Sequence, residues 1–154
     1  MIAIGSDHGG FGLKQEIMKY LEEEEIAFKD FGCYEMLRCD YPDVAEAVAL
    51  SVVNGESDKG IVICGTGVAV SMVANKIPGI RCALCGDVYS AQFSRYHNDA
   101  NMLALGGRVL GGGVAIEILD AWLNAKFDGG RHQDRINKIY AIERKYAPVN
   151  RDES

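Results

Sequence analysis

The chain has 154 residues, and its hydrophobic and charged fractions, 48% and 25%, are those of an ordinary globular domain. This composition excludes a disordered chain, and the 18 glycines have no three-residue period that would indicate collagen. A net charge of −6 argues against nucleic-acid binding, although a small anion needs only a local cluster of cations. We expect one domain over residues 1–146 and a loose tail over 147–154.

The N-terminus and the cysteines bear on the compartment. The first residues form a short apolar run without a basic segment, so we expect no signal peptide, and no run is long enough to span a membrane. Five cysteines, an odd number, fit a reducing cytoplasm better than a disulfide framework. The sequence therefore predicts a cytoplasmic protein.

Short apolar runs alternate with amphipathic segments along the chain. Strands are predicted at residues 1–5, 26–31, 60–64, 80–85 and 102–105, and helices at 11–24, 41–54, 68–75, 88–96, 114–125 and 132–146. This alternation is typical of βαβ units, so the expected fold class is α/β with a parallel sheet and helices on both faces. Ligands of such folds bind at the carboxyl ends of the strands, where most of the glycines fall.

The segment Cys64-Gly65-Thr66-Gly67 follows the most apolar strand and opens a helix. A helix N-terminus favours a thiolate, and the glycines allow backbone N–H groups to face an anion. The segment matches neither a Walker A loop nor a dinucleotide fingerprint nor a cysteine phosphatase loop, because Val70 stands where the last two need glycine or arginine. Alternatively, Cys64 only ends a buried strand and the glycines make a turn.

Three further groups of polar residues could serve a site. Asp7 and His8 follow the first strand and could bind sugar hydroxyls or move protons, or Asp7 could only cap a helix. His97 ends a helix, and we expect it in the same layer as Cys64 and Asp7, where its imidazole would suit proton transfer. Arg131 and Arg135 share one face at the start of the last helix and could bind a phosphate or the chain's own carboxylates.

Two features have weaker functional readings. The C-x-x-C of Cys82 and Cys85 lies in a predicted buried strand and lacks a second ligand pair, so core packing is favoured over a redox or zinc role. The last helix has an apolar stripe at Ile136, Ile139 and Tyr140 and follows a complete five-strand unit. This stripe indicates packing on a partner subunit.

Taken together, these segments resemble the ribose-5-phosphate isomerase type B family, which includes galactose- and allose-6-phosphate isomerases. The resemblance covers residues 1–146 and rests on eight strings in order: Gly5-Ser6-Asp7-His8-Gly9-Gly10, Asp40-Tyr41-Pro42, Gly60-Ile61-Val62-Ile63-Cys64-Gly65-Thr66-Gly67, Ala74-Asn75-Lys76, Gly79-Ile80-Arg81, Ser94-Arg95-Tyr96-His97-Asn98-Asp99-Ala100-Asn101, Leu105-Gly106-Gly107-Arg108-Val109 and Gly129-Gly130-Arg131-His132.

The resemblance implies a Rossmann-like αβα sandwich with a five-stranded parallel sheet, an enzyme of the pentose phosphate pathway, and no metal or cofactor. It implies a homodimer or homotetramer with the active site between subunits and the last helix on the neighbour. Cys64 would be the base that moves a proton through an enediolate, and His97 would assist ring opening. Thr66 and the loop amides would stabilise the oxyanion, and the arginines would chiefly bind the phosphate. The remaining implied substrate ligands are Asp7, His8, Tyr41, Gly65, Thr66, Gly67, Val68, Ala69, Asn98, Arg108, Arg131 and Arg135.

The loop departs from the family pattern at one position. Many members have glycine where this chain has Ala69, and alanine tolerates a positive φ poorly. Some members replace the cysteine by a glutamate at the position of Val70, so only the thiol mechanism is open to this chain. The alternatives are a hexose-6-phosphate isomerase of the same family and a non-catalytic flavodoxin-like module that binds phosphosugars.

Overall fold

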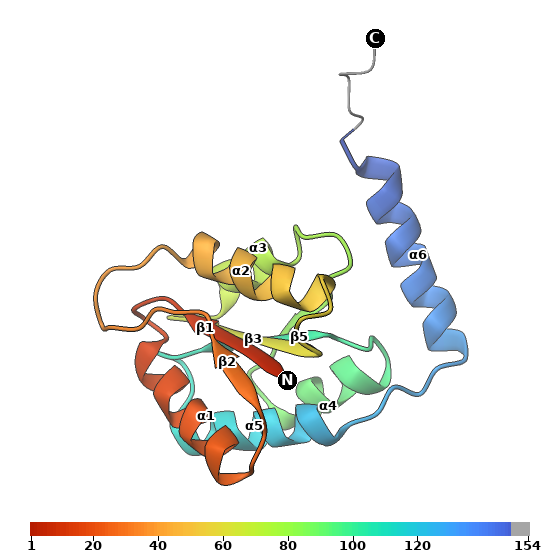
Figure 1. The fold of residues 1–154 in the computed structure, drawn as a ribbon. Helices are drawn as coiled ribbons and strands as arrows, with labels where there is room; N and C mark the ends of the chain where they lie inside the picture. Colours follow the sequence, from red (N-terminus) through yellow and green to blue (C-terminus); the bar gives the residue numbers. More distant parts are fainter. Residues whose placement is uncertain (149–154) are drawn as a thin grey trace.

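A computed structural model describes residues 1–148 and contains one five-stranded sheet and six helices (Figure 1). The strands are β1 (Ile2–Ser6), β2 (Phe28–Asp30), β3 (Lys59–Cys64), β4 (Cys82–Leu84) and β5 (Met102–Gly106). The helices are α1 (Phe11–Glu23), α2 (Tyr41–Val53), α3 (Val68–Ala74), α4 (Val88–Tyr96), α5 (Gly112–Asn124) and α6 (Arg131–Tyr146). The predicted α/β fold is confirmed, and most of the predicted tail, residues 149–154, lies outside the described residues.

The sheet is parallel throughout, in the order β2-β1-β3-β5-β4. The three central strands are almost wholly buried, which explains their continuous apolar runs. The two edge strands are shorter than predicted, with three residues each. The prediction of a buried strand at 80–85 is wrong, because β4 lies at the edge of the sheet and its Leu84 is exposed.

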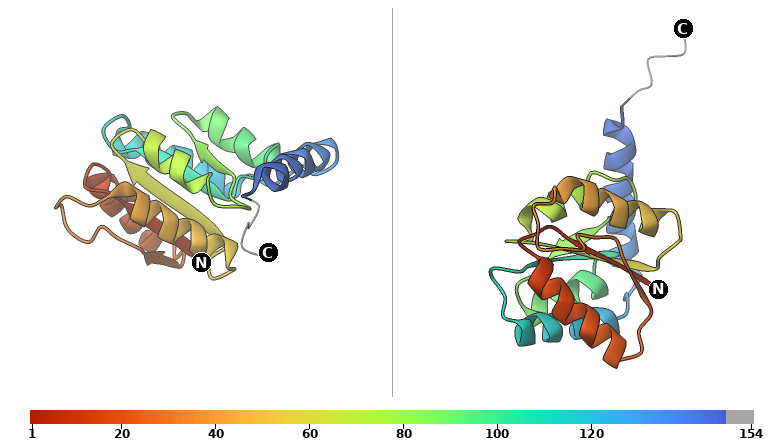
Figure 2. Two further views of the ribbon diagram at one scale, coloured as in Figure 1. Left: turned by 90° about the horizontal axis from the view of Figure 1, so that it is seen from above. Right: turned by 60° about the vertical axis from the view of Figure 1, so that its left-hand side comes forward.

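Helices α2 and α3 cover one face of the sheet, and α1, α4 and α5 cover the other (Figures 1 and 2). Each face has its own apolar cluster, one around Val48 and Val62 and one around Ile17 and Trp122. The crossovers thus give the expected αβα sandwich. In this arrangement the loops after the strands all reach the same edge of the sheet.

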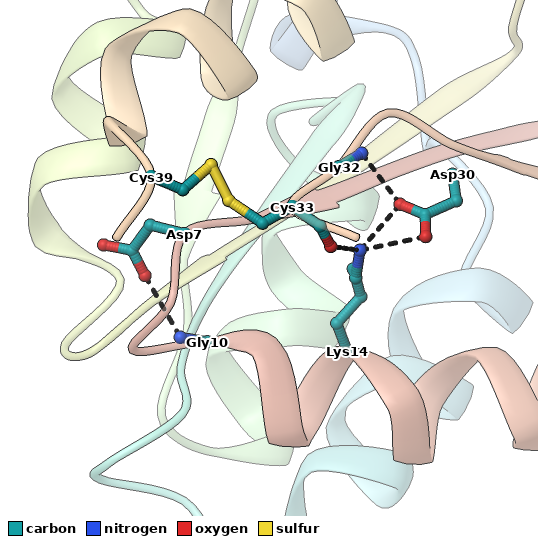
Figure 3. Close-up of a disulfide and its surroundings, with 7 residues drawn as sticks. All are labelled: Asp7, Gly10, Lys14, Asp30, Gly32, Cys33 and Cys39. Atoms are coloured by element: carbon teal, nitrogen blue, oxygen red, sulfur yellow. Dashed lines mark hydrogen bonds and ion pairs between the residues drawn. A yellow bond between two sulfur atoms is a disulfide. The ribbon is translucent and has the colours of Figure 1, made fainter. Parts of the chain in front are cut away.

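The loop after β2 is held by a buried lysine and a disulfide (Figure 3). Lys14 of α1 is fully buried, and its ammonium donates to both carboxylate oxygens of Asp30, at 2.8 and 2.9 Å, and to the carbonyl of Cys33. Cys33 is joined to Cys39 across six residues of sequence, which contradicts the expectation that no disulfide framework is present. A cysteine count cannot reveal this pair, because only the turn after β2 brings the two thiols together.

Helix α6 stands apart from the two helical layers and runs past the β4 side of the sheet (Figure 1). Its contacts with the rest of the chain are few: Ile136 is buried, Glu143 accepts from the backbone N–H of Gly79, and Tyr140 contacts Arg81. Ile139 and Ile142 remain exposed beside a groove of about 540 Å³. Within residues 1–148, no helix combines the length and apolar character that a membrane span requires.

Candidate active site

Cys64 lies at the carboxyl end of the central strand β3, with only 4% of its surface exposed. Its sulfur accepts a hydrogen bond from the backbone N–H of Gly67 at 3.1 Å. Gly67 has a φ of +78°, and a Cβ there would lie 2.6 Å from Leu84 and 2.8 Å from the backbone of Leu105. Only glycine fits this position, so the turn that directs an N–H group at the sulfur is fixed by its surroundings.

The loop from Gly65 to Ala69 leads into α3. Thr66 is exposed, and its hydroxyl accepts from the backbone N–H of Val68 at 3.2 Å. Ala69 lies inside α3 with helical backbone, so the expected difficulty with a positive φ at this position does not arise. The exposed Thr66 hydroxyl and the backbone of this loop therefore lie next to Cys64.

The loop after β1 packs against the Cys64 loop. Asp7 is buried, and its carboxylate accepts from the backbone N–H of Gly10 at 3.1 Å, so it stabilises the turn that precedes α1 (Figure 3). A Cβ on Gly9 would lie 3.0 Å from the backbone nitrogen of Gly65, so the two loops touch through their backbones. Asp7 therefore braces the turn but does not cap α1, whose N-cap is Gly10, and its second carboxylate oxygen makes no hydrogen bond within residues 1–148.

A groove of about 380 Å³ opens next to these loops, which we call the His8 groove. It is lined by His8, Gly9, Gly12, Leu13, Met36, Gly107 and Arg108. Arg108 lies beside Gly65 and forms no ion pair within residues 1–148, so its charge is available to an anion. Tyr41, the first residue of α2, lies on the same edge of the sheet and is partly exposed.

The other predicted site residues lie at the opposite edge of the sheet. His97 follows α4 and precedes β5, and the carbonyl of the exposed Asn98 accepts from Arg81, which precedes β4. Both are therefore at the amino ends of the strands, and the expectation that His97 shares a layer with Cys64 is wrong within one chain. The reason is topological: a helix that follows a strand returns the chain to the edge from which that strand started.

Arg131 and Arg135 open α6 at this amino edge, beside His132. The imidazole of His132 is stacked on that of His97, with ring centroids 4.2 Å apart and planes at 12°. Burial, then the neighbouring His97, Arg131 and Arg135, lower the pKa of His132, which keeps it neutral at pH 7. The two arginines are exposed and form no ion pair within residues 1–148, so the chain's own carboxylates do not neutralise them.

The predicted site is thus divided into two halves. The carboxyl-edge half holds Asp7, His8, Tyr41, Cys64, Gly65, Thr66, Gly67, Val68, Ala69 and Arg108, and the amino-edge half holds His97, Asn98, Arg131 and Arg135. A six-residue strand such as β3 extends about 20 Å. One copy of the chain therefore cannot bring a small ligand into contact with both halves.

Three residues that support the site were missed in the sequence. Arg95 donates to Asp99 and to the carbonyl of Ala100, both at 2.7 Å, and Arg81 donates to the carbonyl of Asp99 at 2.8 Å, so these arginines hold the turn after His97. No sequence pattern marks them. Lys14 could have been found, because it stands in the apolar stripe of α1 at helical spacing from Ile17 and Leu21.

The pKa values of Cys82 and Cys85 differ from those of a redox-active pair. Burial, and then the neighbouring Cys85, raise the pKa of Cys82 to about 12, and burial raises that of Cys85 to about 11. Redox pairs instead have thiols of lowered pKa. The packing interpretation is therefore favoured by the structure.

Comparison with known proteins identifies the family. The model of a family described as Ribose/Galactose Isomerase matches residues 2–139. Ribose-5-phosphate isomerase B of Escherichia coli is 53% identical over 144 residues, which cover 94% of this chain and 97% of that protein.

Solved structures agree with this result. Ribose-5-phosphate isomerase B of Clostridium thermocellum is 53% identical and superimposes with a TM-score of 0.94, over 95% of this chain and 99% of that one. The enzyme of Mycoplasma genitalium, solved with bound ribulose 5-phosphate, is 42% identical with a TM-score of 0.89, over 94% and 96% of the two chains. This chain therefore belongs to the ribose/galactose isomerase family.

Proposed function

We propose that the protein is an aldose–ketose isomerase that interconverts ribose 5-phosphate and ribulose 5-phosphate. The observation that carries the proposal is Cys64, held at the end of β3 with a backbone N–H group on its sulfur. Its relatives named as ribose-5-phosphate isomerases, and the ribulose 5-phosphate bound to one of them, support this choice of substrate.

The reaction moves one proton between neighbouring carbons. The Cys64 thiolate takes the proton from C2 of the open-chain aldose, which leaves an enediolate with its negative charge on O1. The resulting thiol returns a proton to C1, and the hydroxyl proton of O2 moves to O1 as C2 becomes the carbonyl carbon. The backbone N–H of Gly67 donates to the Cys64 sulfur at 3.1 Å and holds it in place at the end of β3. Backbone N–H groups of the Gly65–Ala69 loop and the Thr66 hydroxyl stabilise the oxyanion that forms as the proton leaves.

The remaining polar residues bind and prepare the sugar. His97 exchanges a proton with the ring oxygen as the furanose opens. Asp7, Tyr41 and Asn98 contact the sugar. Arg108, Arg131 and Arg135 bind the phosphate, and His8 stands beside Arg108 in the same groove. Phosphate binding fixes the substrate so that its reacting carbons lie at the sulfur.

We infer that two copies of the chain build each site, in a homodimer that can pair further into a tetramer. The unpaired edge strand β4 and its neighbours expose Leu84, Met72 of α3 and Tyr89 of α4, with 44%, 62% and 67% of their surfaces accessible. A two-fold axis perpendicular to the strands would set two β4 edges side by side and antiparallel. The amino-edge half of one copy would then face the carboxyl-edge half of the other.

Phosphorylated pentoses are charged and do not cross membranes, so we place the enzyme in the cytoplasm, in pentose phosphate metabolism. Its partners are then a small sugar phosphate and its own copies, rather than nucleic acid or a membrane. The base, the oxyanion donors and the phosphate ligands are all supplied by the chain itself, and the reaction as written requires no cofactor.

The test is a comparison of kcat/KM for ribose 5-phosphate and allose 6-phosphate with the purified protein. We expect the pentose phosphate to be preferred at least tenfold, on the order of the discrimination that one extra substrate carbon allows. Preference for the hexose phosphate would make the protein a hexose-6-phosphate isomerase of the same family. Binding without turnover of either sugar would instead identify a phosphosugar-binding module.

A further inference from the structure

We propose that the Cys33–Cys39 disulfide is a reversible modification site for small thiols and disulfides such as glutathione, and that it controls how tightly the substrate binds. The segment that it closes, residues 33–39, follows β2 and leads to Tyr41 at the start of α2. In a reducing compartment a disulfide is usually transient or redox-sensing rather than structural. The effect on binding, though not the exchange itself, rests on the proposed function.

The two ends of this segment are held in different ways. The Cys33 end is fixed without its sulfur, because its backbone N–H donates to the carbonyl of Ser6 at 2.6 Å and its carbonyl accepts from the buried Lys14 (Figure 3). Residues 35–39 form no hydrogen bond within residues 1–148. The disulfide is therefore the link that ties the Cys39 end to the sheet, and its reduction releases that end while Cys33 stays in place.

The released segment borders the groove in which we expect the substrate. Met36 lines the His8 groove together with His8 and Arg108, yet 71% of its surface is exposed, so little packing holds it there once the disulfide opens. Cys39 also stands two residues before Tyr41, which contacts the sugar in the proposed function. The disulfide form keeps this wall ordered before the substrate arrives, whereas the dithiol form must order it during binding, which weakens binding.

The two sulfurs differ in access, which gives the exchange a defined course. Cys39 is partly exposed and Cys33 is buried, so a glutathione thiolate attacks the sulfur of Cys39. The protein S–S bond breaks, its electron pair leaves on Cys33 as a thiolate, and a mixed disulfide forms at Cys39. A second glutathione thiolate attacks the glutathione sulfur of this mixed disulfide and releases Cys39 as a thiolate. Two glutathione molecules are thereby oxidised to glutathione disulfide, and the two protein thiolates take up the protons that the glutathione thiols lost.

The test compares a disulfide form, made with glutathione disulfide, with a dithiol form, made with excess reduced glutathione, each freed of glutathione before the assay. A thiol reagent added to the unfolded protein should count three thiols per chain in the first form and five in the second. Trypsin cleaves after Arg38, an exposed residue inside the closed segment, and should cut the dithiol form about fivefold faster or more. KM for ribose 5-phosphate should be about threefold higher or more in the dithiol form, with little change in kcat.

Two variants separate this disulfide from the other thiols. Cys82→Ala keeps the disulfide and should show the same two forms as the unchanged protein. Cys39→Ser removes the accessible sulfur and should have the KM and the cleavage rate of the dithiol form, whichever glutathione species is added.

The proposal is overturned by a thiol count that glutathione does not change, or by equal cleavage rates or equal KM values of two forms that differ in thiol count. A protein whose cleavage at Arg38 follows the thiol count, but which turns over no phosphosugar, would leave the exchange site intact and refute the proposed function instead.

Discussion

The two halves of the site are built in different ways. At the carboxyl edge, Cys64 and Asp7 are buried, and each accepts a hydrogen bond from the backbone N–H of a glycine. At the amino edge, Asn98, Arg131 and Arg135 project from the surface. In the proposed function, the first half is a fixed reaction centre, whereas the second supplies charge and protons. Neither half contains both Cys64 and the arginines of α6. The comparison therefore predicts that damage to either half lowers activity, and that the two halves are active only in combination.

Loss of the base should have the largest effect. Cys64→Ala removes the only thiol at the carboxyl edge that faces Gly67, and we expect kcat for ribose 5-phosphate to fall by about 10³ or more. Substrate binding should change little, as measured by calorimetry. Cys82→Ala is the matched control and should retain activity, whereas near-normal turnover of Cys64→Ala would remove the base from the mechanism.

Mixing two variants that are each inactive at a low substrate concentration should restore activity if the halves come from different copies. Cys64→Ala and the double variant Arg131→Ala/Arg135→Ala are refolded together in equal amounts. Half of the dimers are then mixed, and each has one intact site, so about a quarter of the original activity should return. The measurement is the rate of ribose 5-phosphate turnover by the mixture, compared with the rate of each variant alone. A mixture as inactive as its parents would mean that one chain supplies both halves.

The amino-edge arginines should control binding more than chemistry. Arg131→Ala removes a charged hydrogen bond to the phosphate, worth about 1.5–3 kcal/mol, and should raise KM about tenfold or more with a smaller change in kcat. Arg144→Ala, in the last turn of the same helix, removes an equal charge far from the site and should leave KM unchanged. Equal KM values for the two variants would contradict the phosphate role.

The free energy of unfolding should fall at alkaline pH because of the buried Cys85 thiol next to β4. The pKa of Cys85 is near 9.0 for a free thiol and about 11 in the folded chain, so above pH 9 the unfolded chain binds fewer protons than the folded one. The free energy of unfolding then falls as pH rises, by up to about 1.4 kcal/mol per pH unit for this thiol. Denaturation curves at pH 8 to 10.5 should show a shallower fall for Cys85→Ala, and an identical slope would refute the buried thiol.

The sequence predicted the central sheet well because its strands are buried on both faces and read as uninterrupted apolar runs. It overestimated β4, since a short edge strand with apolar side chains resembles a buried one in sequence. It placed Asp7, Cys64 and Arg108 at one edge, because all three stand at or just beyond the carboxyl end of a strand. His97 was misplaced because it follows a helix. Arg81 was missed because its bonds reach backbone carbonyls 17 and 18 residues away, and Arg95 because its bonds depend on the shape of the turn after α4.

The side chain of Leu84 has a consequence that reaches beyond packing. It is partly exposed on the outermost strand, yet it lies against Gly67, whose N–H group holds the sulfur of Cys64. Only two residues thus separate the outer rim of the sheet from the reactive atom. A molecule that packed on that rim would touch a side chain in direct contact with the glycine that positions the proposed base.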